Sequence, residues 1–192
     1  EVDLVSVHEH QYTFRDPVLR FWVANIVKGI EVSLNASPLD LAGLMNRLDA
    51  QFQRVSEELG EAQESNIREL MRQFDGQVVP GILLGQTEPV TLPRFERVSD
   101  FRSADGQVEL DAIGETASGE HWVVEAKWKS KRVGRREAEK LVSHAQMFPG
   151  QTWFISRSGF TEDALTFART LNMYTTDGQN FRALKNLLSK PF

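Results

Sequence analysis

Apolar residues recur along this chain with two different periods, which predict helices in one part and strands in another. Residues 61–74 have helical spacing, and Asp75-Gly76 ends that segment. Further along, the pattern predicts strands at 78–84, 98–101, 108–115 and 121–129, a helix at 135–147, a strand at 153–156, a helix at 162–171, a strand at 173–176 and a helix at 180–188. Strands followed by alternating helices and strands indicate an α/β domain.

The N-terminal quarter of the chain has a pattern of its own. Residues 2–14 alternate weakly and predict a hairpin or a wing. A helix begins at Pro17, and its apolar residues are too many for one exposed face, so it needs a packing partner. Helical spacing then resumes over 39–59. We therefore expect an N-terminal helical appendage over residues 1–56 and a separate domain over residues 57–192.

A short polar turn joins the strands predicted at 108–115 and 121–129, so the two strands form a predicted β-hairpin. A hairpin symmetric about Ser118 pairs residues whose numbers sum to 236, which places Asp111 opposite Glu125. Two carboxylates facing each other, roughly 5 Å apart at Cβ, repel each other. A divalent cation between their oxygens would turn this repulsion into attraction.

Strand alternation places Lys127 on the same face as Glu125, and Trp122, Val124 and Ala126 on the opposite face. A solvated charged face is the alternative interpretation. The apolar opposite face and the position of these charges in mid-strand argue against it. Two acids and a lysine that converge on one point predict a metal-dependent phosphodiesterase site.

The composition of the chain limits the kinds of protein that could carry such a site. The chain has 192 residues, 41% of them hydrophobic, which suffices for a core. It has no cysteine, so disulfides and thiolate metal sites are excluded, and a reducing, cytoplasmic location is expected. No apolar run is long enough to span a membrane, so no membrane partner is expected. The net charge of −5 argues against nucleic-acid binding by the whole surface.

A local basic run follows the strand that carries Glu125. Six cations fall within ten residues: Lys127, Lys129, Lys131, Arg132, Arg135 and Arg136. An ordinary solvated loop and helix start would give the same pattern. The position directly after the acid-bearing strand favours contact with phosphates instead, so these residues are candidates for nucleic-acid binding.

These residues resemble a known signature. Asp111 followed by Glu125-Ala126-Lys127 resembles the PD-(D/E)XK nuclease motif, although Leu110 stands where that motif often has Pro. The segment from 153 to 178 resembles the end of Mrr-type restriction endonuclease domains, and the likeness covers about residues 57–192. It implies a restriction endonuclease-like αβββαβ core, with a mixed central sheet flanked by helices.

The resemblance also implies roles for individual residues. Asp111 and Glu125 would hold Mg²⁺ or Mn²⁺, with the Ala126 carbonyl as a possible third ligand. Lys127 would orient or help deprotonate the attacking water and stabilise charge on the phosphate. A glutamate on the first helix of the domain often joins such a site. Glu64 is the best match, Glu61 is its rival, and an ordinary surface glutamate is the alternative.

Residues 12–22 resemble the segment that closes the winged-helix part of archaeal-type ATPases and joins it to a nuclease-like domain. The likeness covers only about residues 1–35 and implies an ATPase module upstream as a partner. The chain itself has no G-x-x-x-x-G-K-[ST] phosphate-binding loop. An unrelated helical appendage is the alternative, and a second copy of the chain is another partner for it.

The sequence thus predicts a metal-dependent endonuclease that hydrolyses DNA, with double-stranded DNA as the expected substrate. It would be the effector part of a larger ATPase or of a restriction or defence system. Two alternatives stay open: a catalytically silent nucleic-acid-binding or assembly domain on the same fold, and a structural appendage to an ATPase.

Overall fold

The computed structural model describes residues 5–8, 11–14, 43, 46, 50 and 60–189, and the chain divides into two compact units, Glu1–Leu59 and Gly60–Phe192. In the first unit, β1 (Val5–His8) and β2 (Gln11–Phe14) form an antiparallel hairpin within the range predicted for one. Residues 43, 46 and 50 are helical, as predicted. The helix predicted from Pro17 lies outside the described residues.

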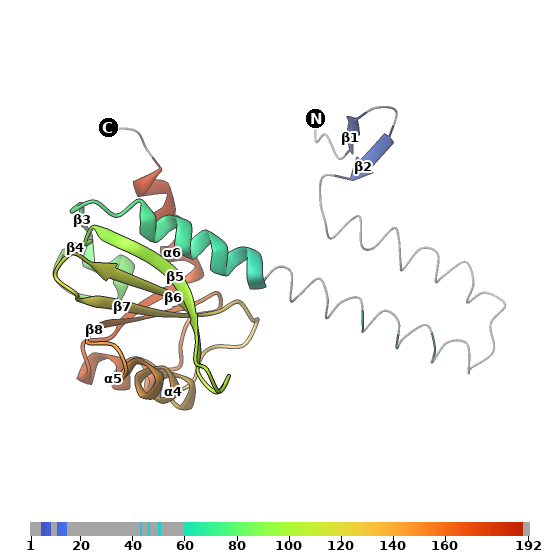
Figure 1. The fold of residues 1–192 in the computed structure, drawn as a ribbon. Helices are drawn as coiled ribbons and strands as arrows, with labels where there is room; N and C mark the ends of the chain where they lie inside the picture. The colour runs from blue at the N-terminus through green and yellow to red at the C-terminus, as the bar shows by residue number, and fades with distance from the viewer. Residues whose placement is uncertain are drawn as a thin grey trace. The chain divides into compact units, whose positions relative to one another are not determined.

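A five-stranded mixed sheet forms the centre of the second unit (Figure 1). Its strands, in spatial order, are β5 (Phe95–Arg102), β6 (Glu109–Thr116), β7 (His121–Lys127), β8 (Gly150–Ser156) and β9 (Tyr174–Asp177). Strand β6 is antiparallel to both of its neighbours, β5 and β7, whereas β7, β8 and β9 run parallel. Parallel neighbours need a crossover connection. These crossovers are α4 (Arg135–Ala145) and α5 (Glu162–Thr170).

Helices cover both faces of this sheet (Figure 1). Residues 60–72 form a helix that packs on one face together with α6 (Gly178–Leu188). Helices α4 and α5 pack on the other face. The predicted α/β fold with a mixed sheet flanked by helices is therefore confirmed. None of the described helices combines the length and the apolar character needed to cross a membrane.

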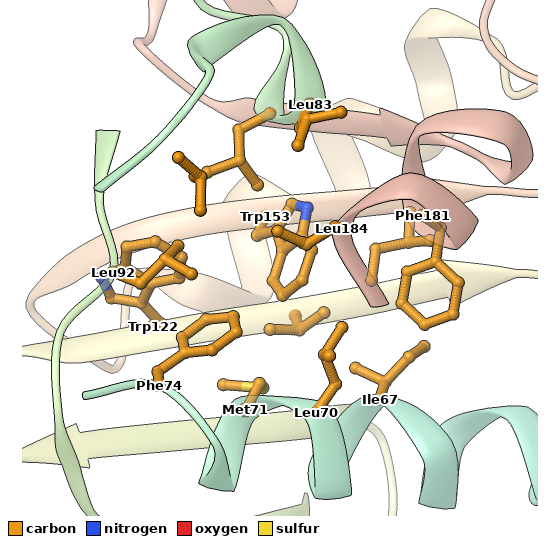
Figure 2. Close-up of a cluster of buried hydrophobic side chains, with 14 of the residues drawn as sticks. Ile67, Leu70, Met71, Phe74, Leu83, Leu92, Trp122, Trp153, Phe181 and Leu184 are labelled. Atoms are coloured by element: carbon orange, nitrogen blue, oxygen red, sulfur yellow. The ribbon is translucent and has the colours of Figure 1, made fainter. Parts of the chain in front are cut away.

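Large aromatic side chains fill the core under the helix over residues 60–72 (Figure 2). The rings of Phe74 and Trp122 lie 6.0 Å apart at 77°, and those of Trp122 and Trp153 lie 6.1 Å apart at 79°. These edge-to-face arrangements are favourable for aromatic pairs. The Trp153 indole N–H donates to Thr176 Oγ1 (2.8 Å), and that hydroxyl donates to the Leu83 carbonyl (2.8 Å), so no polar atom of this bridge is left unpaired.

The strand predicted over residues 78–84 is wrong beyond its first residues. Only β3 (Val78–Val79) is extended, paired with β4 (Val90–Thr91), and η2 (Gly81–Leu84) is a 3₁₀ helix. Pro80 cannot donate to a ladder. Leu83 and Leu84 are neighbours and are both buried in the same core, which the opposite faces of a strand would not allow.

Polar caps fix where the last two helices begin. Thr161 Oγ1 accepts a hydrogen bond from the Ala164 N–H (3.3 Å) and caps α5 at the start of the predicted helix. Asp177 caps α6 by accepting from two backbone N–H groups, at 2.9 and 2.8 Å. Helix α6 therefore begins at Gly178, two residues earlier than predicted, because the last residue of β9 is itself the cap.

A chain shortened to begin at Gly60 is expected to unfold in one cooperative transition. The apolar residues of its first helix, among them Ile67, Leu70 and Met71, are buried within the second unit itself. Circular dichroism and urea unfolding would test this. A shortened chain without a cooperative transition would show that the first 59 residues belong to the same folding unit.

Candidate functional site

The β6–β7 hairpin has the register predicted from its turn. The Cα partners are Ala112↔Val124, Ile113↔Val123, Gly114↔Trp122 and Glu115↔His121, and each pair sums to 236. The turn closes with Gly119, at φ +79°, whose N–H donates to the Thr116 carbonyl (2.9 Å). A left-handed residue suits glycine at this place.

Asp111 lies at a β-bulge, just beyond this regular pairing. On the β5 side, Ser99 pairs with Ile113 and Phe101 with Leu110, so one residue of β5 faces two residues of β6. Pairing with β7 ends at Ala112, so Asp111 and Glu125 are the next positions along and not a ladder pair, which corrects that detail of the prediction. Bulges of this kind re-aim a side chain.

The Asp111 side chain takes a hydrogen bond from the neighbouring strand. Its Oδ2 accepts from the Ala126 N–H at 2.6 Å. The guanidinium of Arg68, on the helix over residues 60–72, donates to the Asp111 backbone carbonyl at 2.7 Å. The bulge is thus held from β7 on one side and from the covering helix on the other.

Burial raises the pKa of Asp111 to about 7, and the nearby Glu125 carboxylate adds to this rise by repulsion. Glu64 contributes a smaller repulsion, while the Ala126 N–H and the Lys127 ammonium partly offset it. Without a bound cation, Asp111 is therefore only partly ionised near neutral pH. A carboxyl group with a strongly displaced pKa beside a second carboxylate is characteristic of functional sites.

Glu125 and Lys127 come from the end of β7 and contact each other as an ion pair. Their side chains are 17% and 31% exposed, respectively. Burial by itself would lower the pKa of Lys127, but attraction to Glu125 and Asp111 raises it overall. Lys127 is therefore a cation at neutral pH, suited to hold an anion or a water molecule and not to act as a free base.

Glu64 is half-buried and belongs to the same electrostatic group. Burial raises its pKa, and Glu125 and Glu109 raise it further, while Arg68 lowers it. Glu61, its rival in the sequence, is exposed. Of the two, Glu64 is the residue whose charge acts on both Asp111 and Glu125.

The donor chemistry suits a hard divalent cation that keeps part of its water shell. Within residues 60–189, no three carboxylate or imidazole groups are close enough to enclose a metal ion. Mg²⁺ usually binds through one or two carboxylates and several waters, so Asp111 and Glu125 fit it without a third acid. Their mutual repulsion, together with burial, is the observation that favours a cation between them.

The basic residues after β7 differ in their surroundings. Lys129, Lys131, Arg132 and Arg136 are exposed. Arg135 is engaged instead: it pairs with Glu139 at 2.8 Å and with Asp163 at 3.6 Å, and lies 5.2 Å from the centre of the Phe167 ring. The segment between β7 and α4 is held in place, because Ser158 Oγ donates to the Lys129 carbonyl (2.8 Å) and Val133 bridges to Phe160.

Sequence reasoning did not single out Arg68, although it touches the backbone of Asp111. The available signal was its spacing of four residues from Glu64 on one helix, which places both side chains on the same face. That signal says nothing of the bulge, which lies 43 residues away in the sequence.

Comparison with known proteins gives one family match. Residues 93–184 match the Mrr_cat family model, described as restriction endonuclease. Asp111, Glu125 and Lys127 lie inside the match, and Glu64 lies outside it. A crystal structure of a protein of unknown function, AF1548, is 19% identical, with a TM-score of 0.36, and the match covers 42% of this chain and 48% of that chain. No curated protein matches the sequence.

Proposed function

Because residues 93–184 form a restriction endonuclease domain of the Mrr_cat family, which is of the PD-(D/E)XK type, we propose that the chain is a metal-dependent endonuclease acting on double-stranded DNA. The observation that carries the proposal is the grouping of Asp111, Glu125 and Lys127 at the end of the hairpin, with the pKa of Asp111 raised to about 7. A merely solvated charged face would not hold two half-buried acids beside each other.

Asp111 and Glu125 would hold Mg²⁺ or Mn²⁺ by their carboxylate oxygens, with the Ala126 carbonyl as a further ligand. When bound, the metal would supply charge stabilisation to the phosphate and lower the pKa of a bound water. Asp111 must lose its proton to act as a ligand, so metal binding and proton release are coupled. The Lys127 ammonium would then orient the attacking water and stabilise the negative charge that develops on the phosphate.

Glu64 would support this site from the covering helix. Burial is the main cause of its raised pKa, and the negative charge of Glu125 adds to that rise. A bound cation would offset that charge and favour the ionised form of Glu64. We assign it an auxiliary place beside the metal and keep Asp111 and Glu125 as the direct ligands.

A catalytically silent nucleic-acid-binding or assembly domain on the same fold is the competing function. The complete acid-acid-lysine set argues against it, since a binding domain gains nothing from two half-buried carboxylates that repel each other. The test is to incubate the purified chain with supercoiled plasmid, linear duplex, single-stranded DNA and RNA, each with Mg²⁺, Mn²⁺ or EDTA. Nicking or linearisation of duplex only with metal supports the proposal. Binding without any cleavage supports the silent domain.

The members of the basic run after β7 that make no ion pair among the described residues are expected to contact phosphates. Arg135 is also exposed, but it is engaged by Glu139 and Asp163 and is not expected to do so. Lys131→Ala and Arg136→Ala should each weaken duplex binding and reduce the slope of log affinity against log salt by about 0.9 per lost contact. Arg135→Ala should leave the slope nearly unchanged, because its guanidinium is engaged by Glu139 and Asp163. Fluorescence anisotropy in EDTA across a salt series measures this. Three equal slopes, all matching the wild type, would contradict it.

An upstream ATPase module and a second copy of the chain remain proposals for the partner of the N-terminal unit. Residues 12–22, which resemble the ATPase segment, overlap β2 (Gln11–Phe14) and otherwise lie outside the described residues. Analytical ultracentrifugation of the chain alone tests the second copy directly. One chain has a mass of 21.8 kDa, and a dimer would give twice that value.

A further inference from the structure

A hollow of about 640 Å³ opens at the carboxyl ends of β8 and β9, beside the first turn of α6. Its volume falls in the range of roughly 300–1,000 Å³ that ligand pockets occupy. No part in binding has been given above to its lining, apart from that of Arg132 in the basic run. The hollow is not part of the group formed by Asp111, Glu125 and Lys127.

Four arginines from four separate segments converge on this hollow: Arg132 before α4, Arg157 after β8, Arg169 in α5 and Arg182 in α6. Among the described residues, none of the four guanidinium groups forms an ion pair or donates a hydrogen bond. Arg135 nearby and Arg102 on β5, by contrast, are both paired with acids. Like charges gathered without partners repel one another, and an anion between them removes that repulsion.

The other polar groups of the lining favour an anion as well. Only two acids, Glu162 and Asp177, line the hollow, which leaves an excess of two positive charges. The Asp177 carboxylate already accepts from the N–H groups of Gln179 and Asn180. Thr175 also lines the hollow, and its hydroxyl, which makes no hydrogen bond to a described residue, is able to donate one to an anion.

The hollow lies at the same end of the strands as Glu125 and Lys127, where β7, β8 and β9 have their carboxyl ends. Lys127 pairs in register with Ser156, and Ser156 with Asp177, so two strand spacings separate Lys127 from the residue that borders the hollow. Two spacings are roughly 10 Å. Each strand of duplex DNA carries one phosphate per 3.4 Å of helix axis, so a strand that lies along this end of the sheet has more than one phosphate within such a span. A strand with one phosphate beside Lys127 would therefore place another phosphate within reach of the arginines.

We propose that this arginine hollow is a second phosphate-binding subsite, which holds a phosphate of the nucleic-acid strand that lies at the Asp111–Glu125 centre. The inference rests on the proposed function for the identity of the ligand, while the anion preference rests on the hollow itself. Arginine suits the task because its planar fork binds two phosphate oxygens at once. The phosphate is either an internal phosphodiester or the terminal monophosphate of a DNA end, and the two share the same recognition chemistry.

The test compares two variants of the full chain that lose the same charge. Arg169→Gln with Arg182→Gln removes two guanidinium groups from the hollow. Arg94→Gln with Arg97→Gln removes two exposed ones near and on β5, the opposite edge strand of the sheet. Both variants are first checked for an unchanged thermal unfolding midpoint. Binding of a short duplex, with either a 5′-phosphate or a 5′-hydroxyl, is then measured by anisotropy in EDTA over a salt series.

The hollow variant is expected to lose about 0.9 from the salt slope, and the control variant little, because the hollow holds one phosphate and each lost phosphate contact contributes about 0.9. Loss for both duplexes identifies an internal phosphodiester, and loss for the 5′-phosphorylated duplex alone identifies a terminal phosphate. An unchanged slope in the hollow variant, or no binding by the wild type, overturns the inference. Cleavage is measured separately with Mg²⁺. A chain that binds DNA through the hollow but never cuts it would contradict the proposed nuclease function and still support the phosphate subsite.

Discussion

Asp111→Asn and Glu125→Gln are each expected to abolish metal-dependent cleavage of DNA and to leave the fold of residues 60–189 intact. Asparagine keeps an oxygen that can accept the hydrogen bond from the Ala126 N–H, and Arg68 contacts only the backbone at this position. The fold therefore loses little, while the metal loses a charged ligand. Isothermal titration with Mn²⁺ should show binding in the wild type and none in either variant.

Lys127→Ala should separate metal binding from turnover. The titration should still show metal binding, because lysine is not a ligand, while the cleavage rate should fall by about 10²–10³-fold, the loss typical when one charge-stabilising donor is removed. Asp100→Asn is the matched control, since Asp100 is an exposed acid on β5 beside the same bulge. Cleavage that survives in Asp111→Asn, or that is lost equally in Asp100→Asn, would refute the assignment.

Metal-free wild-type protein is expected to lose stability relative to Asp111→Asn as the pH rises from about 4 to about 8. Asp111 has a pKa of about 7 in the folded protein, above the ordinary aspartate value of 3.8, so the folded state binds this proton more tightly. The resulting stability is fully present below the unfolded pKa and disappears as the pH rises through about 7. The expected loss is on the order of 2–4 kcal/mol, because each pH unit over which the proton is released contributes about 1.4 kcal/mol.

Urea unfolding in EDTA at several pH values measures this difference, and subtraction of the Asp111→Asn curve removes the contributions of other groups. In the Glu125→Gln variant, the stability lost by neutral pH should be smaller than in the wild type. This substitution removes the repulsion that helps to raise the pKa of Asp111. Addition of Mn²⁺ should restore the wild type most strongly at high pH, where the ligand is already ionised. A difference between wild type and Asp111→Asn that stays constant from pH 4 to pH 8 would contradict the raised pKa.

The parts of the site that depend on local rules could be predicted from the sequence. The hairpin register followed from the symmetric turn around Ser118, because the turn fixes which residues pair. Thr161 was recognisable as a helix cap from its place before an apolar stretch. The order of helices and strands followed from hydrophobic periodicity in the same way.

The parts that depend on distant segments could not be predicted. The bulge at Asp111 arises from pairing with β5, and the sequence of the hairpin carries no mark of it. The contact from Arg68 spans 43 residues, and the arginine hollow joins four segments that come together only in the folded sheet. The error at residues 81–84 has the same cause, since burial of both Leu83 and Leu84 against the core decided the local backbone.

The bulge has a consequence for how this domain can change over evolution. Leu110 and Ile113 are three positions apart, yet both pack into the core beneath α4, which a regular strand would not permit. Deleting one residue between them would leave Leu110 and Ile113 two positions apart, so a regular strand would still turn both toward the core while the bulge at Asp111 disappeared. The core therefore does not require the extra residue, and a descendant that no longer cleaves can lose it together with the acid. A silent relative would then be recognised by a strand that is one position shorter between its two core residues.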